Sequence, residues 1–267
     1  MSPVRRLLWF LLALLLISLV VTSCASRTPA DQPPVAEDSV TDTATEEAPA
    51  ASATVDAAEP EPVPAPAAPA PAVPQVATSS TRVAPASAVY RHRVEQATAR
   101  AWGVHASAAR LAAQLHQESA FKADAKSGAG AQGIAQFMPA TAKWIATVYP
   151  DELANFDPWN AQQAIMAAAL YDRWLYDRVR PLANAAVDTC SRWAFALRGY
   201  NGGEGWLTKE RTLAKSNGAD PDDWLAVEPY RVRAQWAHKE NTQYPRRILL
   251  TLEPAYIAAG WQGVKTC

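Results

Sequence analysis

Residues 89–267 have little of what sheet-forming, metal-binding or nucleic-acid-binding proteins need. Strand-like alternation of apolar and polar residues is nearly absent, which argues against a β-sheet core. The four histidines and three cysteines of the chain form no HExxH motif and no paired Cys/His spacing, so no metal site is predicted. The region carries 21 basic and 17 acidic residues, and this small excess does not indicate a nucleic-acid partner.

What the region does have is helical periodicity. Apolar residues recur at helical spacing over residues 89–102, 107–118, 139–149, 160–179, 187–200 and 245–261. A region of about 180 residues is long enough to bury one sizeable core. We therefore predict a single, mainly α domain over residues 89–267, with one small hairpin within residues 119–132.

The first 24 residues have the composition of an export signal. Arg5 and Arg6 precede an apolar run over residues 7–21, which is short for a membrane-spanning helix. We expect a signal peptide over residues 1–23. The sequence Val-Thr-Ser-Cys that ends at Cys24 resembles a lipobox, at which bacteria attach lipid to the cysteine and cleave before it. The alternative is an uncleaved anchor.

The residue after this cysteine is Ala25 rather than an aspartate. By resemblance to the sorting rule of Gram-negative bacteria, this favours an outer-membrane lipoprotein that faces the periplasm. Several acyl chains on Cys24 would hold the protein firmly at the membrane.

A linker is predicted over residues 24–88. It holds twelve of the chain's 21 prolines, and nine acids against Arg27 and Arg82 give it a net charge of −7. Such a composition cannot bury a core and is expected to be disordered and extended, at up to about 3 Å per residue. The segment can serve as a tether that lets the folded domain act at a distance from the membrane, or simply as a spacer without a specific role. The same composition is compatible with both functions.

A candidate catalytic acid lies at the end of the second predicted helix. Ser107 can cap this helix, and Leu111, Leu115 and Glu118 recur at i, i+4 and i+7, which places Glu118 on the apolar stripe. Contact with hydrocarbon raises the pKa of a carboxyl, so that it stays protonated near neutral pH and can act as a general acid. The alternative is a helix-end glutamate turned into water.

Three glycines, Gly128, Gly130 and Gly133, satisfy the pattern GxGxxG, which in other contexts binds dinucleotides. That pattern requires a buried strand before it, whereas here a polar loop precedes it and the flanks are helical. No dinucleotide or other cofactor is predicted. We expect these glycines to permit turns and a close approach of the backbone to a substrate.

Residues 118–142, ESAFKADAKSGAGAQGIAQFMPATA, resemble the signature of the SLT-type lytic transglycosylases. The shared features are Glu-Ser, a following Phe, Ala-x-Ser, a glycine pattern, a Gln and Met-Pro-x-Thr-Ala. Ile134 and Ala135 stand where Leu-Met is usual in that family.

Two further landmarks of the family follow in the expected order. Residues 199–203, GYNGG, stand where the family has Ala-Tyr-Asn-Ala-Gly. Glu240 and Tyr244 match a Glu with a Tyr four residues on, although Asn241 replaces the usual Thr. The segment between these landmarks, roughly 207–236, is longer than in compact members and resembles a phage-type branch.

The resemblance implies a lysozyme-like, mainly α fold with a substrate groove. It also implies an enzyme that cleaves the MurNAc-GlcNAc β-1,4 bond of peptidoglycan without a cofactor. In that family one glutamate, here Glu118, protonates the leaving oxygen and then removes a proton from the sugar's own 6-hydroxyl, which closes a 1,6-anhydromuramyl end. We expect a monomer that acts on peptidoglycan glycan strands.

Substrate-binding roles are implied by the same resemblance. The residues are Ser127, Gln136 and Met138 around the scissile bond, Tyr200 and Asn201 in the second landmark, and Glu240 and Tyr244 in the groove. Tyr200 would orient Glu118 or stabilise developing charge, and Asn201 would shape its turn. For each residue the alternative is support of the fold, above all for Met138, since a Met between Phe and Pro often serves packing.

No second catalytic carboxylate is evident around Glu118. The candidates Asp124, Asp151, Glu152 and Asp157 lie in polar or turn-rich stretches and are expected to be solvated or capping residues. Glycosidases that use water normally carry two carboxylates, so their absence favours attack by the tethered hydroxyl of the sugar itself. A muramidase that uses water, and a wall-binding lipoprotein without catalysis, stay open as alternatives.

Counting cysteines predicts a disulfide. With Cys24 lipidated, Cys190 and Cys267 are left as an even pair in an oxidising compartment. We expect these two residues to be bonded.

Overall fold

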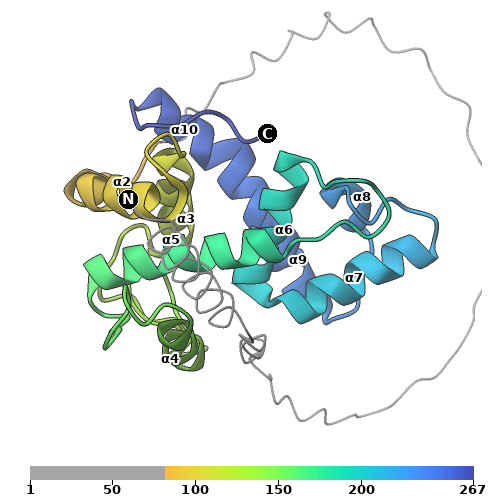
Figure 1. The fold of residues 1–267 in the computed structure, drawn as a ribbon, viewed down its shortest axis with the longest axis horizontal. Helices are drawn as coiled ribbons and strands as arrows, with labels where there is room; N and C mark the ends of the chain where they lie inside the picture. The colour runs from red at the N-terminus through yellow and green to blue at the C-terminus, as the bar shows by residue number, and fades with distance from the viewer. Residues whose placement is uncertain (1–81) are drawn as a thin grey trace, which may run out of the picture.

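The computed structural model describes residues 82–267 (Figure 1). The predicted signal peptide, the lipidation site at Cys24 and residues 24–81 of the predicted linker lie outside the described residues. Within the described part, no helix combines the length and the apolar character that crossing a membrane requires.

Helices dominate the described residues, which pair only in isolated β-bridges and not in strands. In chain order the elements are α2 (Ser87–Trp102), α3 (Ala108–Ser119), α4 (Pro139–Val148), α5 (Ala161–Arg178), α6 (Thr189–Gly202), α7 (Glu204–Ser216), α8 (Trp224–Val227), α9 (Gln235–Arg247), the π-helical turn η2 (Ile248–Leu252) and α10 (Glu253–Ala258). The prediction of a mainly α domain is confirmed, and its first five helices begin and end within two residues of the predicted ranges.

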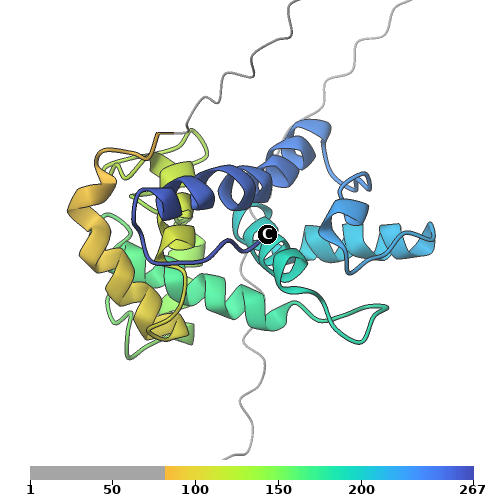
Figure 2. The same cartoon turned by 90° about the horizontal axis from the view of Figure 1, so that it is seen from above.

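Helix α5 crosses the middle of the domain, with α2 and α3 towards one end and α6 towards the other (Figures 1 and 2). Its buried face is rich in alanine, including Ala164, Ala167 and Ala168, which are fully buried. Such small side chains let neighbouring helices approach closely, so that both α2 and α6 pack against the same helix. This central helix joins the two halves between which the candidate site forms.

The folded part begins slightly before the predicted domain boundary at residue 89. Helix α2 starts at Ser87, and Ala84 is buried, with its N–H directed at the hydroxyl of Tyr256 at 3.3 Å. The last residues of the predicted linker therefore belong to the folded domain.

Helix α3 carries Glu118 in its last turn. The predicted cap is confirmed: the Ser107 hydroxyl accepts the N–H of Arg110 at 3.3 Å, and it also donates to the buried Glu253 at 3.0 Å. The helix ends because Ala120 and Phe121 both adopt left-handed backbone angles, with φ of 52° and 66°. Side chains with a Cβ disfavour this region, and such strain is typical of functional sites.

The glycine-containing loop after α3 is only partly the hairpin that was predicted. Lys126 and Phe137 each form a single antiparallel bridge with Gln132, and no ladder follows. Gly133, with φ of 74°, lies so close to Pro158 that an added Cβ would come within 1.9 Å of its carbonyl oxygen. Contact with the loop that contains Pro158 therefore requires a glycine at this position.

The prediction of one helix over residues 245–261 is wrong in its boundaries. Helix α9 already begins at Gln235 and contains Pro245, and the chain then passes through η2 into α10. Pro245 has no N–H to donate, so the regular hydrogen-bond ladder is interrupted, and the five-residue π-helical turn follows directly. Tyr244, the last residue of the third landmark, precedes this irregularity.

The long segment between the second and third landmarks forms α7 and the short α8 (Figure 1). Both pack against α6, and α6 in turn packs against α9. Three of the residues it contributes, Glu210, Arg211 and Asp222, are charged and buried. The segment is therefore an integral layer of the domain.

Cys190, near the start of α6, forms a disulfide with Cys267. The two residues are 77 positions apart in sequence. The bond fixes the C-terminal residues beside α3, where Gln262 accepts the N–H of Ala109 at 2.9 Å.

Thiol counting on the mature protein without reductant is expected to find neither of these two cysteines free. Because the bond closes a long loop in the unfolded chain, Cys190→Ser should lower the free energy of unfolding by about 4 kcal/mol, measured by chemical denaturation. Reductant should have the same effect on the parent and none on the variant. Two free thiols in the untreated protein would contradict the bond.

Candidate active site

Glu118 is partly buried and accepts a short hydrogen bond from the hydroxyl of Tyr244, 126 residues later in the chain. Burial raises the pKa of Glu118 to about 8; the bond from Tyr244 opposes this shift, and the nearby charges of Asp172 and Glu240 add to it. The carboxyl therefore carries its proton at neutral pH, as the position of Glu118 on the apolar stripe predicts. This is the state that a general acid needs.

Tyr244, rather than Tyr200, is the hydrogen-bond partner of Glu118. The hydroxyl of Tyr200 donates to the carbonyl of Ala135 at 2.8 Å, and its ring lies 5.9 Å from that of Phe137. Burial raises the pKa of Tyr200 well above its usual value, and the charge of Glu118 adds to the shift, so the two groups are neighbours. Tyr200 thus ties the second landmark to the glycine-containing loop.

A cleft of about 420 Å³ lies next to Glu118. Its lining includes Tyr244, the hydrogen-bond partner of Glu118, and Gln117, which precedes Glu118 in the sequence. The cleft is lined by Gln117, Glu240, Gln243, Tyr244, Arg246, Arg247, Leu250 and Thr251. The cleft thus contains two of the predicted substrate-binding residues, Glu240 and Tyr244. The side-chain oxygen of Gln117 is buried there and accepts no hydrogen bond from the described residues.

The predicted residues Ser127, Gln136 and Met138 do not line this cleft. The Ser127 hydroxyl accepts the N–H of Ala131 at 3.0 Å, and the Gln136 amide donates to two backbone carbonyls of the loop, at 2.7 and 3.1 Å. Met138 is partly buried and stands at the N-cap of α4. Ser127 and Gln136 thus brace the glycine-containing loop.

Asn201 lies between two residues of the third landmark. Its side-chain oxygen accepts from Asn241 at 3.0 Å, and its amide nitrogen lies 3.5 Å from the exposed carboxylate of Glu240. The second and third landmarks therefore meet beside the cleft.

Asp172 is a second buried carboxyl near Glu118, which the reasoning from sequence missed. It is 3% exposed and accepts a hydrogen bond at 3.1 Å from Gln114, which lies one helical turn before Glu118 on α3. Burial raises the pKa of Asp172 to about 7, while the bond from Gln114 and the charge of Arg110 oppose the shift. The carboxylates weighed from the sequence as partners of Glu118 were Asp124, Asp151, Glu152 and Asp157, and Asp172 was not among them.

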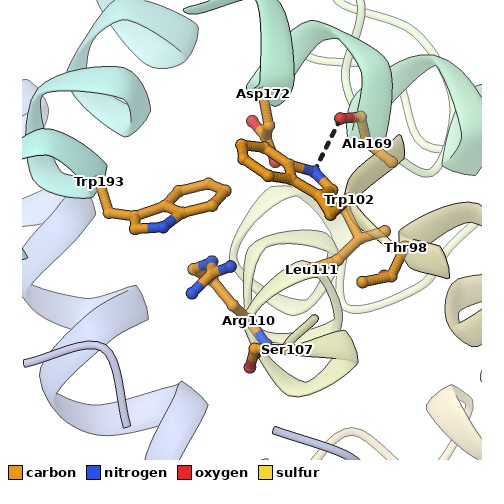
Figure 3. Close-up of a pocket in the computed structure, with 8 residues that line it drawn as sticks. All are labelled: Thr98, Trp102, Ser107, Arg110, Leu111, Ala169, Asp172 and Trp193. Atoms are coloured by element: carbon orange, nitrogen blue, oxygen red, sulfur yellow. Dashed lines mark hydrogen bonds between the residues drawn. The ribbon is translucent and has the colours of Figure 1, made fainter. Parts of the chain in front are cut away.

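Asp172 lines a small cavity and does not line the cleft (Figure 3). The cavity, of about 10 Å³, has room for one water molecule and is lined by Thr98, Trp102, Ser107, Arg110, Leu111, Ala169, Asp172 and Trp193. Asp172 can therefore act on Glu118 through its charge, while the structure offers it no contact with a ligand in the cleft.

Asp172 was detectable by the same test that singled out Glu118. Ile165, Ala168, Asp172 and Leu175 recur at spacings of three and four along α5, and all four are buried. An acid on an apolar helical stripe was thus present in the printed sequence, but it lies 54 positions after Glu118, and only the fold brings the two together. Among residues 82–267, no group of three or more acids, histidines or cysteines gathers as a metal site would require.

The geometry defines a helical domain with a protonated carboxyl at the end of a helix and a cleft beside it. Residues 95–222 match the family described as "Transglycosylase SLT domain". This stretch, 128 of the 267 residues of the chain, is therefore similar to the transglycosylase SLT family.

Similar proteins include two named "Membrane-bound lytic murein transglycosylase F". The one from Actinobacillus succinogenes is 35% identical over 139 residues, which are 51% of this chain and 26% of the relative. The one from Thiobacillus denitrificans is 32% identical over 164 residues, which are 55% of this chain and 32% of the relative. The chain thus matches a third or less of the length of these relatives.

Solved structures similar to this domain include an inactive variant of the lytic transglycosylase Slt from Pseudomonas aeruginosa. That comparison has a TM-score of 0.49 at 24% identity and covers 66% of this chain and 25% of that one. The 70 kDa soluble lytic transglycosylase from Escherichia coli has a TM-score of 0.46 at 20% identity, over 62% and 24% of the two chains.

Glu118→Gln is expected to stabilise the fold at alkaline pH. A carboxyl with a higher pKa in the folded chain than in the unfolded one binds more protons when folded, so stability falls as pH rises from about 4.5 towards 8. The variant lacks this loss, and its amide oxygen can still accept from Tyr244. At pH 8 it should exceed the parent by about 2 to 4 kcal/mol in the free energy of unfolding, with the gain vanishing near pH 4.

The matched control is Glu95→Gln, which removes a glutamate that pairs with Arg91 at the surface of α2. Chemical denaturation at a series of pH values measures all three proteins. A Glu118→Gln gain that does not change with pH, or that appears equally in the control, would show that the Glu118 carboxyl is not held in its protonated form.

Proposed function

We propose that this protein is a peptidoglycan lytic transglycosylase. It cleaves the MurNAc-GlcNAc β-1,4 bond and leaves 1,6-anhydromuramyl ends. The observation that carries this proposal is the Glu118 carboxyl, whose pKa is about 8 and which bonds to Tyr244 beside a cleft. The names of the relatives, which are lytic murein transglycosylases, support the same reaction.

In the first step protonated Glu118 gives its proton to the glycosidic oxygen. The bond between that oxygen and C1 of the MurNAc sugar breaks, and the leaving oxygen keeps the bonding electrons and the new proton. Glu118 becomes a carboxylate, and the hydrogen bond from Tyr244 stabilises its charge.

In the second step the Glu118 carboxylate removes the proton of the 6-hydroxyl of the same MurNAc sugar. The freed oxygen attacks C1 and closes the internal ether, and Glu118 is protonated again for the next cycle. Because burial raises the pKa of Glu118, its carboxylate is a stronger base than a glutamate in water. One carboxyl thus serves both steps.

Hydrolysis by a muramidase would need a second carboxylate to activate water. Asp172 is buried beside a small cavity and does not line the cleft, which argues against that role for it. Glu240 is the specific observation that keeps the muramidase open as a second candidate, because its exposed carboxylate lines the cleft and its charge reaches Glu118.

We also propose that the protein works from the outer membrane, facing the periplasm. Its signal peptide, residues 1–23, would be removed, Cys24 would carry lipid, and the acidic, proline-rich residues 24–88 would let a monomeric domain, residues 89–267, reach the glycan strands. The word "membrane-bound" in the names of the relatives supports this arrangement.

Digestion of isolated peptidoglycan, followed by mass spectrometry of the released fragments, tests the reaction. The parent is expected to release fragments with anhydro ends, and Glu118→Gln should lower the rate by about a hundredfold or more, because it cannot supply the proton. Glu95→Gln is the control and should keep the parent rate. Reducing ends that also depend on Glu240 would establish the muramidase, and no release by the parent would leave only a binding protein.

Asp172→Asn should change the pH profile of the reaction. Loss of the Asp172 charge lowers the pKa of Glu118, so the fall of kcat/KM on the alkaline side is expected to move to lower pH than in the parent. Asp177→Asn, at a half-exposed position on the same helix, is the control and should leave the profile unchanged. An unmoved alkaline limb in Asp172→Asn would show that its charge does not act on Glu118.

A further inference from the structure

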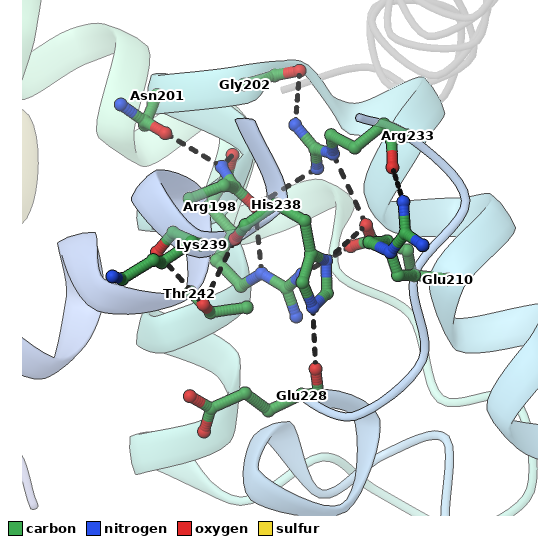
Figure 4. Close-up of polar contacts among 11 residues, drawn as sticks. Arg198, Asn201, Gly202, Glu210, Glu228, Arg233, His238, Lys239 and Thr242 are labelled. Atoms are coloured by element: carbon green, nitrogen blue, oxygen red, sulfur yellow. Dashed lines mark hydrogen bonds and ion pairs between the residues drawn. The ribbon is translucent and has the colours of Figure 1, made fainter. Parts of the chain in front are cut away.

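Glu210 on α7 is a fully buried carboxylate at the centre of a cluster of polar side chains (Figure 4). It forms ion pairs with Arg198 of α6 and with Arg233, which lies 3.3 Å away, and His238 of α9 contacts it at 3.0 Å. Two guanidinium groups thus compensate one buried charge. Glu210 and Arg233 both belong to the stretch that separates the second and third landmarks.

Asn241, which is fully buried, connects this cluster to the second landmark. Its side-chain oxygen accepts from Arg198 at 3.0 Å and from Arg233 at 3.1 Å. Its amide nitrogen donates to the carbonyl of Arg198 at 2.8 Å and to the side chain of Asn201 at 3.0 Å. Guanidinium groups only donate hydrogen bonds, so they determine which end of the amide faces them.

The chain of contacts then reaches the cleft. Asn201 receives the amide of Asn241 and directs its own amide towards the carboxylate of Glu240 at 3.5 Å. Glu240 lines the cleft beside Tyr244. A continuous path of side chains therefore leads from buried Glu210 to an exposed carboxylate in the proposed binding site.

Gly202, one of the positions at which the chain departs from the family pattern, lies in close contact with Arg233 and Asn241. A Cβ added to Gly202 would lie 2.4 Å from a guanidinium nitrogen of Arg233 and 2.6 Å from the amide nitrogen of Asn241. The glycine at 202, where the family has alanine, thus leaves the space that Arg233 and Asn241 occupy. Gly202 and Asn241, which both differ from the family pattern, therefore pack together with Arg233 of the long segment.

We propose that Glu210 and Arg233 are positioning residues: through the buried Asn241 and through Asn201 they hold Glu240 as a rigid part of the wall of the cleft that binds the glycan strand. This inference rests on the proposed function. A wall fixed before binding loses less side-chain freedom when the strand docks, so its benefit appears in affinity. Glu118 and Tyr244 are bonded to each other outside this cluster, so the chemical step keeps its acid.

The test compares Arg233→Gln with Arg231→Gln in the full chain. Arg231 is exposed, and its side chain contacts the carbonyl of Arg233, so the control removes the same charge from the same loop without touching Glu210 or Asn241. Arg233→Gln is expected to raise KM for peptidoglycan at least fivefold and to change kcat by less than twofold. Arg231→Gln should change neither constant.

Double variants show whether Arg233 acts through Asn201. The rise in KM on adding Arg233→Gln to Asn201→Ala should be smaller than its rise in the parent, since the wall is already broken. Full additivity would overturn the proposal, as would a lower melting temperature with unchanged KM, or a fall in kcat alone. If Arg233→Gln does not fold, Arg233→Lys takes its place and should raise KM by a smaller factor.

A measurement of peptidoglycan binding tests this inference independently of the proposed lytic activity. Sedimentation with insoluble peptidoglycan measures affinity in the Glu118→Gln background, where no strand is cut. Weaker binding of the Arg233 variant there supports the wall even if the parent proves to have no lytic activity. Equal binding of both variants would refute the wall while leaving the reaction untouched.

Discussion

The rest of the site depends on the burial of one carboxyl, that of Glu118 at the end of α3. Glu118 holds its proton because the fold surrounds it, and the bond from Tyr244 limits how far its pKa rises. The enclosure requires that α3 end abruptly, which the left-handed residues Ala120 and Phe121 achieve, and that α9 lie across it. The protonated state of Glu118 therefore depends on a contact between two segments that lie far apart in the sequence.

Two further buried acids, Asp172 and Glu210, have different surroundings. Asp172, covered by two tryptophans and bonded to Gln114, adds a field that favours the protonated form of Glu118. Glu210, by contrast, forms ion pairs with two guanidinium groups, and we propose that its cluster positions Glu240 in the cleft. The same kind of group, a buried acid, thus serves two purposes according to whether cations accompany it.

The parts of this arrangement that depend on local pattern were predictable from sequence. Helical spacing identified α2 to α6, the Ser107 cap and the position of Glu118 on an apolar stripe. The pairing of Glu118 with Tyr244, and the cluster around Glu210, depend on contacts between distant segments, which no periodicity encodes. The boundary of α9 was missed because Pro245 is normally a helix start, whereas here it lies inside a helix that passes into a π-helical turn.

The C-terminal residues bear directly on the helix that carries Glu118. Gln262 accepts the N–H of Ala109, Thr266 accepts from Arg110, and Cys267 is bonded to Cys190. Both ends of α3 are therefore completed by residues that are synthesised more than a hundred positions later. A nascent chain cannot assemble the site around Glu118 until residues 244–267 have left the ribosome, so the order of synthesis makes this site one of the last parts of the domain to form.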